Sequence, residues 1–190
     1  LRAERVSYLH CPVFMGPPAA RNAQGVMLAT GPRALFERVE PDLAKMTGRL
    51  QYMGERTDLA AIHKLLGNAM IIGVCAVMAD VLTLAKACSV DPGDAVGLLG
   101  SLDMNAMVAR RGTSMATGDF TPSFELTMAR KDVRLMLETS GGLPLATLPA
   151  VAARMDEIAD PATHRDFGMH GYLEHLGYSF QVAKKGRSLA

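Results

Sequence analysis

The chain has 190 residues, of which 49% are hydrophobic and 21% charged, which excludes a disordered chain and predicts a packed core. A formal net charge of +1 and an aromatic content of 5%, with no tryptophan, argue against a nucleic-acid-binding surface. Three cysteines without metal-ligand spacing predict free thiols and a reducing, cytoplasmic setting. Cys75 is expected to be buried as a small hydrophobe in an apolar helix.

The first third of the chain is predicted to mix short strands with one helix. Strands are expected at 5–14 (RVSYLHCPVF), 26–30 (VMLAT) and 49–54 (RLQYMG). Between the last two, 32–46 is expected to be helical from Pro32, with a kink or a restart at Pro41. A sheet this small leaves its edges exposed unless another element covers them.

The middle of the chain is predicted to be one long helix, from Thr57 to Ala87, of roughly 45 Å. It is apolar on almost every face, so it is expected to be a buried, central helix. Its longest stretch without polar side chains, 69–79, is shorter than the roughly 20 residues that cross a bilayer. A core helix is therefore favoured over a membrane helix.

The remaining signals are helical. Asp91 is a predicted N-cap for a helix that runs towards Leu99, and Thr121 for one that stops at Gly141. A further helix is expected at 148–160, and the tail after Pro161 is irregular. The sequence thus predicts a mainly α protein, with a small β-containing part followed by an all-helical bundle.

Lys64 and Asn68 interrupt the long apolar helix one turn apart, so their side chains share a face. A partly buried lysine can approach the pH range useful for proton transfer, and an amide beside it could orient a substrate. The alternative is a lysine that reaches solvent and an asparagine that caps a neighbouring loop. Spacing alone leaves both interpretations open.

Two other groups of polar residues invite functional interpretations. Lys131 and Asp132 lie in a charged stripe, and most such stripes are solvated helix faces. Its other members are Arg130, Arg134 and Glu138. His170 and His175 do not align on one helix face and no carboxylate or cysteine completes a ligand set, so no metal site is expected.

Four segments carry a family resemblance. The segment HCPVFMGPPAARNAQGVMLATG is similar to a D-A-P-V-S-G-G segment with the strand that follows it, and GERTDLAAIHKLLGN to a K-x-x-x-N catalytic helix. ADVLTLAKACSVDP is similar to the end of that helix, and FTPSFELTMARKDVRLMLETSGGLPL to a K-D-L segment. In this order they resemble the β-hydroxyacid dehydrogenases, the family of 3-hydroxyisobutyrate and 6-phosphogluconate dehydrogenases and of glyoxylate and succinic semialdehyde reductases.

The resemblance implies a two-domain, NAD- or NADP-dependent oxidoreductase. Residues 1–54 would be the C-terminal part of a Rossmann-type domain, and 55–190 an all-α dimerisation and catalytic domain like the C-terminal bundle of 6-phosphogluconate dehydrogenase. No G-x-G-x-x-G occurs in these residues, so the cofactor's main binding surface is expected upstream of residue 1. The chain alone is then expected to be inactive, and to form a homodimer that covers part of the long helix.

The resemblance also implies roles for single residues. Lys64 matches the general acid/base that exchanges a proton with the oxygen of a β-hydroxyacid or a small aldehyde or ketone. Asn68 matches the asparagine that holds the substrate and the lysine. Lys131, accompanied by Asp132, matches a lysine that approaches the cofactor from the helical domain.

One segment departs from the family pattern. The substrate-binding S-G-G reads Phe14, Met15 and Gly16 here, which removes a hydroxyl grip on a carboxylate and favours a larger or less polar substrate. Two alternatives to a dehydrogenase follow. An imine-reductase-like enzyme fits the apolar Phe14 and Met15 but not Lys64, and a non-catalytic dimerisation or ligand-binding module fits the departure but not the retained lysines.

Overall fold

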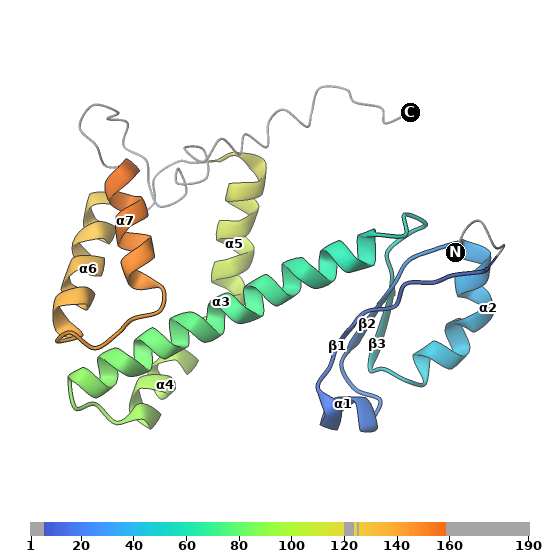
Figure 1. The fold of residues 1–190 in the computed structure, drawn as a ribbon, viewed down its shortest axis with the longest axis horizontal. Coiled ribbons are helices and arrows are strands. Elements are labelled where there is room, and N and C mark those ends of the chain that lie inside the picture. Colours follow the sequence, from blue (N-terminus) through green and yellow to red (C-terminus); the bar gives the residue numbers. More distant parts are fainter. Residues whose placement is uncertain (1–5, 120–123, 125, 159–190) are drawn as a thin grey trace. The chain divides into compact units, whose positions relative to one another are not determined.

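The computed structural model describes residues 6–119, 124 and 126–158. These residues form a small sheet and are otherwise mostly helical, which confirms the predicted mainly α composition (Figure 1). The strands are β1 (Val13–Phe14), β2 (Val26–Ala29) and β3 (Arg49–Tyr52). The helices are α1 (Pro17–Arg21), α2 (Arg33–Ala44), α3 (Leu59–Ala87), α4 (Pro92–Gly100), α5 (Met104–Thr117), α6 (Leu126–Thr139) and α7 (Leu148–Ile158).

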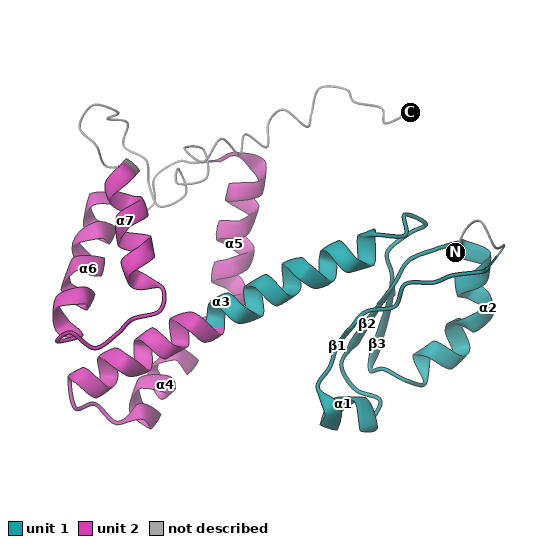
Figure 2. Cartoon of the chain, in the orientation of Figure 1, with its two compact units in different colours: residues 1–74 teal, residues 75–190 magenta. Residues whose placement is uncertain are grey.

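The chain divides into two compact units, residues 1–74 and 75–190, and the division falls within α3 (Figure 2). The predicted domain boundary after Gly54 is a different kind of division. The predicted boundary separates a Rossmann-type part from an all-α part, whereas the two units are groups of residues that contact one another. It therefore stays a prediction.

The first unit is built on a three-stranded sheet in the order β1-β2-β3. β2 runs antiparallel to β1 and parallel to β3, with Phe14 opposite Val26 and Val26 opposite Arg49. Buried side chains of β2 and Phe36 of α2 form its core, and Phe36 stacks on Tyr52 at 4.6 Å between ring centroids. Both later strands are confirmed; the first is shorter than predicted, since the described residues before Val13 add only a bridge at His10.

Of the kink or restart predicted at Pro41, the restart is wrong, and the kink stays a prediction. α2 continues through Pro41 to Ala44, and Pro32 is its N-cap. A proline removes one backbone donor and crowds the carbonyl four residues earlier. Here it lies only three residues before the C-terminal end, where little helix remains to be disrupted.

α3 is confirmed as a single helix, but the prediction that it is buried is wrong for this chain. Its side chains from Leu65 to Val77 are largely exposed, and Cys75, predicted to be buried, is exposed as well. The exposed apolar residues on it include Leu65, Leu66, Met70, Ile71, Ile72, Val74 and Val77. Among the described residues, the other helices of one chain do not enclose this 29-residue apolar helix.

The length and composition of α3 would also allow it to cross a membrane. Its most apolar 18-residue window has a mean hydropathy of 2.0, and only 6% of that window is buried. The predicted exclusion rested on an uninterrupted apolar run, which is a stricter criterion. One such helix is weak evidence, because core helices of soluble proteins meet the same criterion.

In its described residues, the second unit contains the C-terminal part of α3 and the helices α4 to α7. α6 and α7 enclose a core of Leu126, Ala129, Val133, Ala152 and Met155. α4 has the predicted Asp91 N-cap, whose Oδ1 accepts a hydrogen bond from the Gly93 amide at 2.7 Å. α6 ends where glycines adopt positive φ, at Gly141 (φ 60) and Gly142, as predicted. The predicted start at Thr121 and the tail after Pro161 lie outside the described residues.

α5 was not predicted, although its ends carry readable signals. The Asp103 carboxylate caps its N-terminus by accepting from the Ala106 amide at 2.8 Å. Gly118 closes its C-terminus in the left-handed region, with φ 72. Its mixed polar and small residues lack a clear apolar period, which is why the pattern gave no helix.

Candidate active site

Lys64 lies in the second turn of α3, whose start is held by the sheet. The Thr30 hydroxyl, fully buried at the end of β2, donates to the Thr57 carbonyl at 3.1 Å, and the Gly31 amide donates to the Gly54 carbonyl at 3.1 Å. These bonds join the end of β2 to the loop that leads into α3. The sheet therefore sets where the first turns of α3, and with them Lys64, begin.

The structure brings two of the predicted site residues from distant parts of the sequence together. The Nζ atom of Lys64 lies 4.0 Å from the centroid of the Phe14 ring, on β1. Both side chains are half-buried. An ammonium within about 6 Å of an aromatic face is attracted by the ring quadrupole, by about 1 kcal/mol in a partly exposed setting. The Lys64 ammonium is therefore held at the surface of the ring rather than extended into solvent.

Asn68 is one turn beyond Lys64 on α3 and is half-buried. At this spacing the two side chains lie on the same face of the helix. Within the part of the chain that the structure describes, the Asn68 amide makes no hydrogen bond. It has donors and an acceptor available for a ligand, and the alternative of a loop-capping asparagine finds no partner among those residues.

Met15 and Gly16 follow Phe14 where β1 leads into α1. Met15 is half-buried, and Gly16 is exposed as the N-cap of the five-residue α1. Gly25 (φ 91) lets the start of β2 approach this segment closely, since a Cβ there would lie 2.7 Å from the Phe14 carbonyl oxygen. The backbone of Phe14 is thus fixed by close contact with β2.

Gly67 was not predicted as a site residue. A Cβ atom on it would lie 2.4 Å from Cζ and 2.7 Å from Cε1 of Phe14. The aromatic ring therefore rests against the bare backbone of α3, on the turn that carries Lys64 and Asn68. Glycine lowers helix stability relative to alanine by about 1 kcal/mol. A glycine inside a predicted helix is therefore the only feature of the sequence that could have indicated such a contact.

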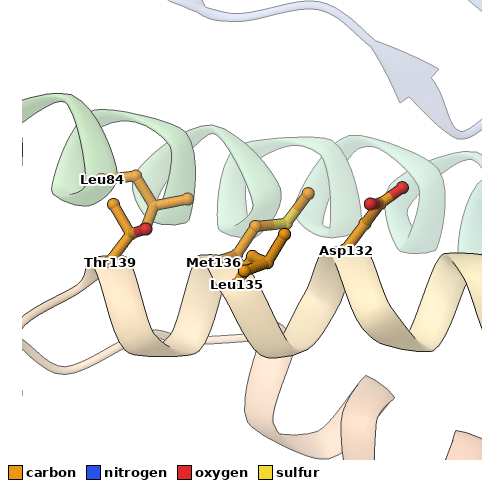
Figure 3. A pocket seen from close by; sticks show the side chains of 5 residues that line it. All are labelled: Leu84, Asp132, Leu135, Met136 and Thr139. Atoms are coloured by element: carbon orange, nitrogen blue, oxygen red, sulfur yellow. The ribbon is translucent and has the colours of Figure 1, made fainter.

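Lys131 and Asp132 lie on α6 in the second unit, so the structure places them within that unit and not relative to Lys64. The Lys131 Nζ is 3.1 Å from Oδ1 of Asp132, and both side chains are about half exposed. Asp132 also lines an open groove of about 270 Å³ with Leu84, Leu135, Met136 and Thr139 (Figure 3). The Lys131 ammonium is accessible to an anionic ligand.

Part of the predicted charged stripe is structural instead. The Arg130 guanidinium makes two hydrogen bonds to Asp156 of α7, at 2.6 and 2.8 Å, and joins α6 to α7. This contact lowers the pKa of the Asp156 carboxyl. Arg134 pairs with Glu138 along α6 at 2.7 Å, as expected of a solvated face.

Asp80, in the C-terminal third of α3, is 2% exposed, and its carboxylate receives four hydrogen bonds. The donors are the Thr147 hydroxyl and the amides of Ala146, Thr147 and Leu148. Burial alone would raise the pKa of Asp80, but these donors favour the charged form and lower the pKa to about 2. The carboxylate is thus a structural cap for the start of α7, and it is not free to exchange protons near neutral pH.

Among the residues that the structure describes, no group of three or more histidine, cysteine or acidic side chains could hold a metal ion. His63 is the neighbour of Lys64 on α3, and its Nδ1 lies 3.0 Å from the Leu59 carbonyl oxygen. His170 and His175 are outside the described residues.

A family model described as "NAD-binding of NADP-dependent 3-hydroxyisobutyrate dehydrogenase" matches residues 60–175. The match covers more than half of the chain, including the turn with Lys64, Gly67 and Asn68 and the helix with Lys131. The chain belongs to this family. The resemblance inferred from four short segments is confirmed, and the family's own description assigns it to the binding of NAD.

Individual relatives are distant. Glyoxylate/succinic semialdehyde reductase 2, chloroplastic, of Arabidopsis thaliana is 29% identical over 147 residues, which are 77% of this chain and 41% of the relative. Cytokine-like nuclear factor N-PAC of Aedes aegypti is 26% identical over 86% of this chain and 29% of its own length. The chain thus spans less than half of either curated relative.

Solved structures show the fold. An imine reductase from Myxococcus stipitatus in complex with NADP+ has a TM-score of 0.79 and 17% identity, covering 92% of this chain and 63% of that protein. At this identity the likeness concerns the fold alone. The chain therefore shares its fold with proteins that are named for imine reduction.

Proposed function

We propose that this chain carries the proton-transfer part of an NAD(P)-dependent oxidoreductase of the 3-hydroxyisobutyrate dehydrogenase-like family. Lys64 is the general acid/base and Asn68 holds the substrate beside it. The observation that carries the proposal is the half-buried Lys64 ammonium, held 4.0 Å from the Phe14 ring centroid on the same helix face as the unpaired amide of Asn68. That amide makes no hydrogen bond within the described residues.

The reaction adds two electrons and two hydrogens to a carbonyl. NADH or NADPH, when bound, supplies a hydride with its electron pair to the carbonyl carbon. The Lys64 ammonium donates its proton to the oxygen as the C=O double bond becomes a C–O single bond, which leaves an alcohol and a neutral amine. In the oxidative direction the amine takes that proton back. Asn68 donates to the carbonyl oxygen or accepts from the hydroxyl, which orients the substrate.

The residues of this chain fit part of a cofactor site. Lys131 presents an ammonium whose nearest partner is the adjacent Asp132, so it can receive a phosphate or ribose oxygen. A G-x-G-x-x-G fingerprint does not occur in these 190 residues, so the chain would contribute Lys131 and not the phosphate loop. In this proposal β1–β3 belong to the C-terminal part of a Rossmann-type domain, and the helices after Gly54 to a bundle like that of 6-phosphogluconate dehydrogenase.

We also propose that a second copy of the chain covers the exposed face of α3. Ile72 and Leu65 are each 68% exposed on this helix. Apolar surface of this extent is normally buried in an interface. A protein interface is favoured over a bilayer because Lys64, Asn68 and Asp80 interrupt the helix with polar side chains, which are costly to place among lipid chains.

The test is oxidation of NADH and NADPH by the full-length gene product with short aldehydes and ketones, beside Lys64→Met. We expect turnover by the natural protein and a loss of about 10²-fold in kcat for the variant, the scale of a lost general acid. Equal turnover by the two proteins would remove Lys64 from the chemistry. Absence of turnover with any carbonyl would favour the non-catalytic alternative.

A further inference from the structure

We infer that Phe14 and Gly67 together set the substrate class: the site takes a neutral aldehyde or ketone with an apolar substituent and disfavours one with a carboxylate. This inference rests on the proposed function, because it concerns the carbonyl on which Lys64 acts. It adds a pair of specificity-determining residues, and it makes Phe14 a positioning residue for the lysine. All the residues involved belong to the first compact unit.

The ring and the helix are matched to each other. Phe14 lies 53 positions before Gly67 in the sequence, yet its Cζ atom is where a Cβ on Gly67 would clash, at 2.4 Å. Gly73, six residues further along α3, has nothing within 4 Å of the same position. The two glycines are therefore not equivalent: Gly67 makes room for an aromatic ring, and Gly73 faces open space.

The Phe14 ring also holds the Lys64 side chain in position. Lys64 and Gly67 are three residues apart and therefore lie on the same side of α3. The Phe14 ring contacts the backbone at Gly67, and the centroid of the same ring is 4.0 Å from the Lys64 Nζ atom. The negative face of the ring attracts the cation and has no hydrogen-bond acceptor that would take its protons. The protons of the ammonium stay available to a carbonyl oxygen.

The same ring is a poor neighbour for a carboxylate. A substrate carboxylate needs donors to replace its water, and Phe14 offers none through its side chain. The electron-rich face of the ring also repels an anion. An alkyl group of the same shape is stabilised by apolar contact with the ring.

A matched pair of aldehydes tests the substrate class. Succinic semialdehyde and 4-methylpentanal have the same chain between the aldehyde and a three-atom end group, which is a carboxylate in one and an isopropyl group in the other. For the full-length gene product we expect kcat/KM to be at least about tenfold higher for 4-methylpentanal, the scale of one misplaced polar group. Phe14→Ser should reverse the preference, and Phe14→Leu should keep it with a lower kcat. A natural preference for succinic semialdehyde, or an unchanged ratio in Phe14→Ser, would overturn the inference.

The glycines provide the control for the ring's position. Gly67→Ala should displace Phe14 and lower kcat with both aldehydes, whereas Gly73→Ala should leave kinetics unchanged. Equal effects of the two changes would contradict the match between ring and helix. A failure of the proposed function would be recognised separately, because Lys64→Met would then turn over substrate as fast as the natural protein.

A readout without catalysis uses the 190-residue chain itself. Reductive ¹³C-methylation labels its lysines, and Lys64→Arg identifies the Lys64 signal by its loss. We expect this signal to be shifted upfield by the Phe14 ring current, and to lose the shift in Phe14→Leu and Gly67→Ala but not in Gly73→Ala. An unshifted Lys64 signal in the natural chain would overturn the inference, whatever the activity.

Discussion

The carboxylate of Asp80 on α3 closes the start of α7 through Thr147, whose hydroxyl donates to Oδ2 at 2.5 Å. The residues are 67 positions apart, so a side chain of one helix acts as the N-cap of another. N-caps are normally supplied by the residue that precedes the helix. Here the cap also ties α3 to the α6–α7 pair within the second unit.

Asp80→Asn should lower the free energy of unfolding by about 3 kcal/mol, the scale of losing charged, buried hydrogen bonds. An amide presents one acceptor oxygen, and its NH₂ group would face backbone donors. Urea unfolding followed by circular dichroism measures the change. Asp42→Asn is the control, since its pair with Lys45 is largely exposed, and it should cost less than about 0.5 kcal/mol. Equal losses of unfolding free energy in the two variants would show that the Asp80 hydrogen bonds stabilise the fold no more than an exposed ion pair does.

The same carboxylate predicts an acid-dependent loss of stability. Its folded-state pKa of about 2 is below the unfolded value of 3.8, so its contribution is complete above about pH 4 and is lost as the pH falls towards 2. The difference corresponds to about 2 kcal/mol. Unfolding curves between pH 5 and pH 2 should therefore fall more steeply for the natural chain than for Asp80→Asn. Parallel curves would contradict the assigned pKa shift.

A second copy over α3 predicts a dimer in solution. Ile72→Glu places a charge on the most exposed part of the apolar face and should shift the mass from dimer to monomer in light scattering at micromolar concentration. Met46→Glu, equally an exposed apolar residue but beyond the end of α2, should leave the dimer intact. A monomeric natural chain would refute the dimer, and flotation with lipid vesicles would favour a membrane location of α3.

Lys131→Ala should weaken cofactor binding without removing the proton donor. We expect the KM for NADH or NADPH to rise about tenfold, the scale of one charged hydrogen bond, with a smaller effect on kcat. Lys45→Ala, which removes an exposed ammonium from the first unit, should change neither constant. An unaffected cofactor KM would return Lys131 to the solvated face of α6.

The contacts that matter most here differ in how far a sequence can predict them. The spacing of Lys64 and Asn68 puts them on one helix face, because helical geometry is local. The contact of Phe14 with Lys64 and Gly67, and the cap that Asp80 provides for α7, join residues more than 45 positions apart, and local patterns carry no information about such pairs. Exposure of α3 could not be predicted either, since an apolar pattern shows that a helix seeks cover but not where the cover comes from.

In the proposed reaction, Lys64 transfers the proton. The most direct measurement is kcat of the full-length gene product and of Lys64→Met with the best carbonyl substrate, at saturating cofactor. Leu65→Met, a neighbouring change on the same helix, is the matched control and should retain full activity. We predict a loss of about 10²-fold or more in kcat for Lys64→Met alone. An unchanged kcat in Lys64→Met would contradict the proposed role of Lys64 as the general acid.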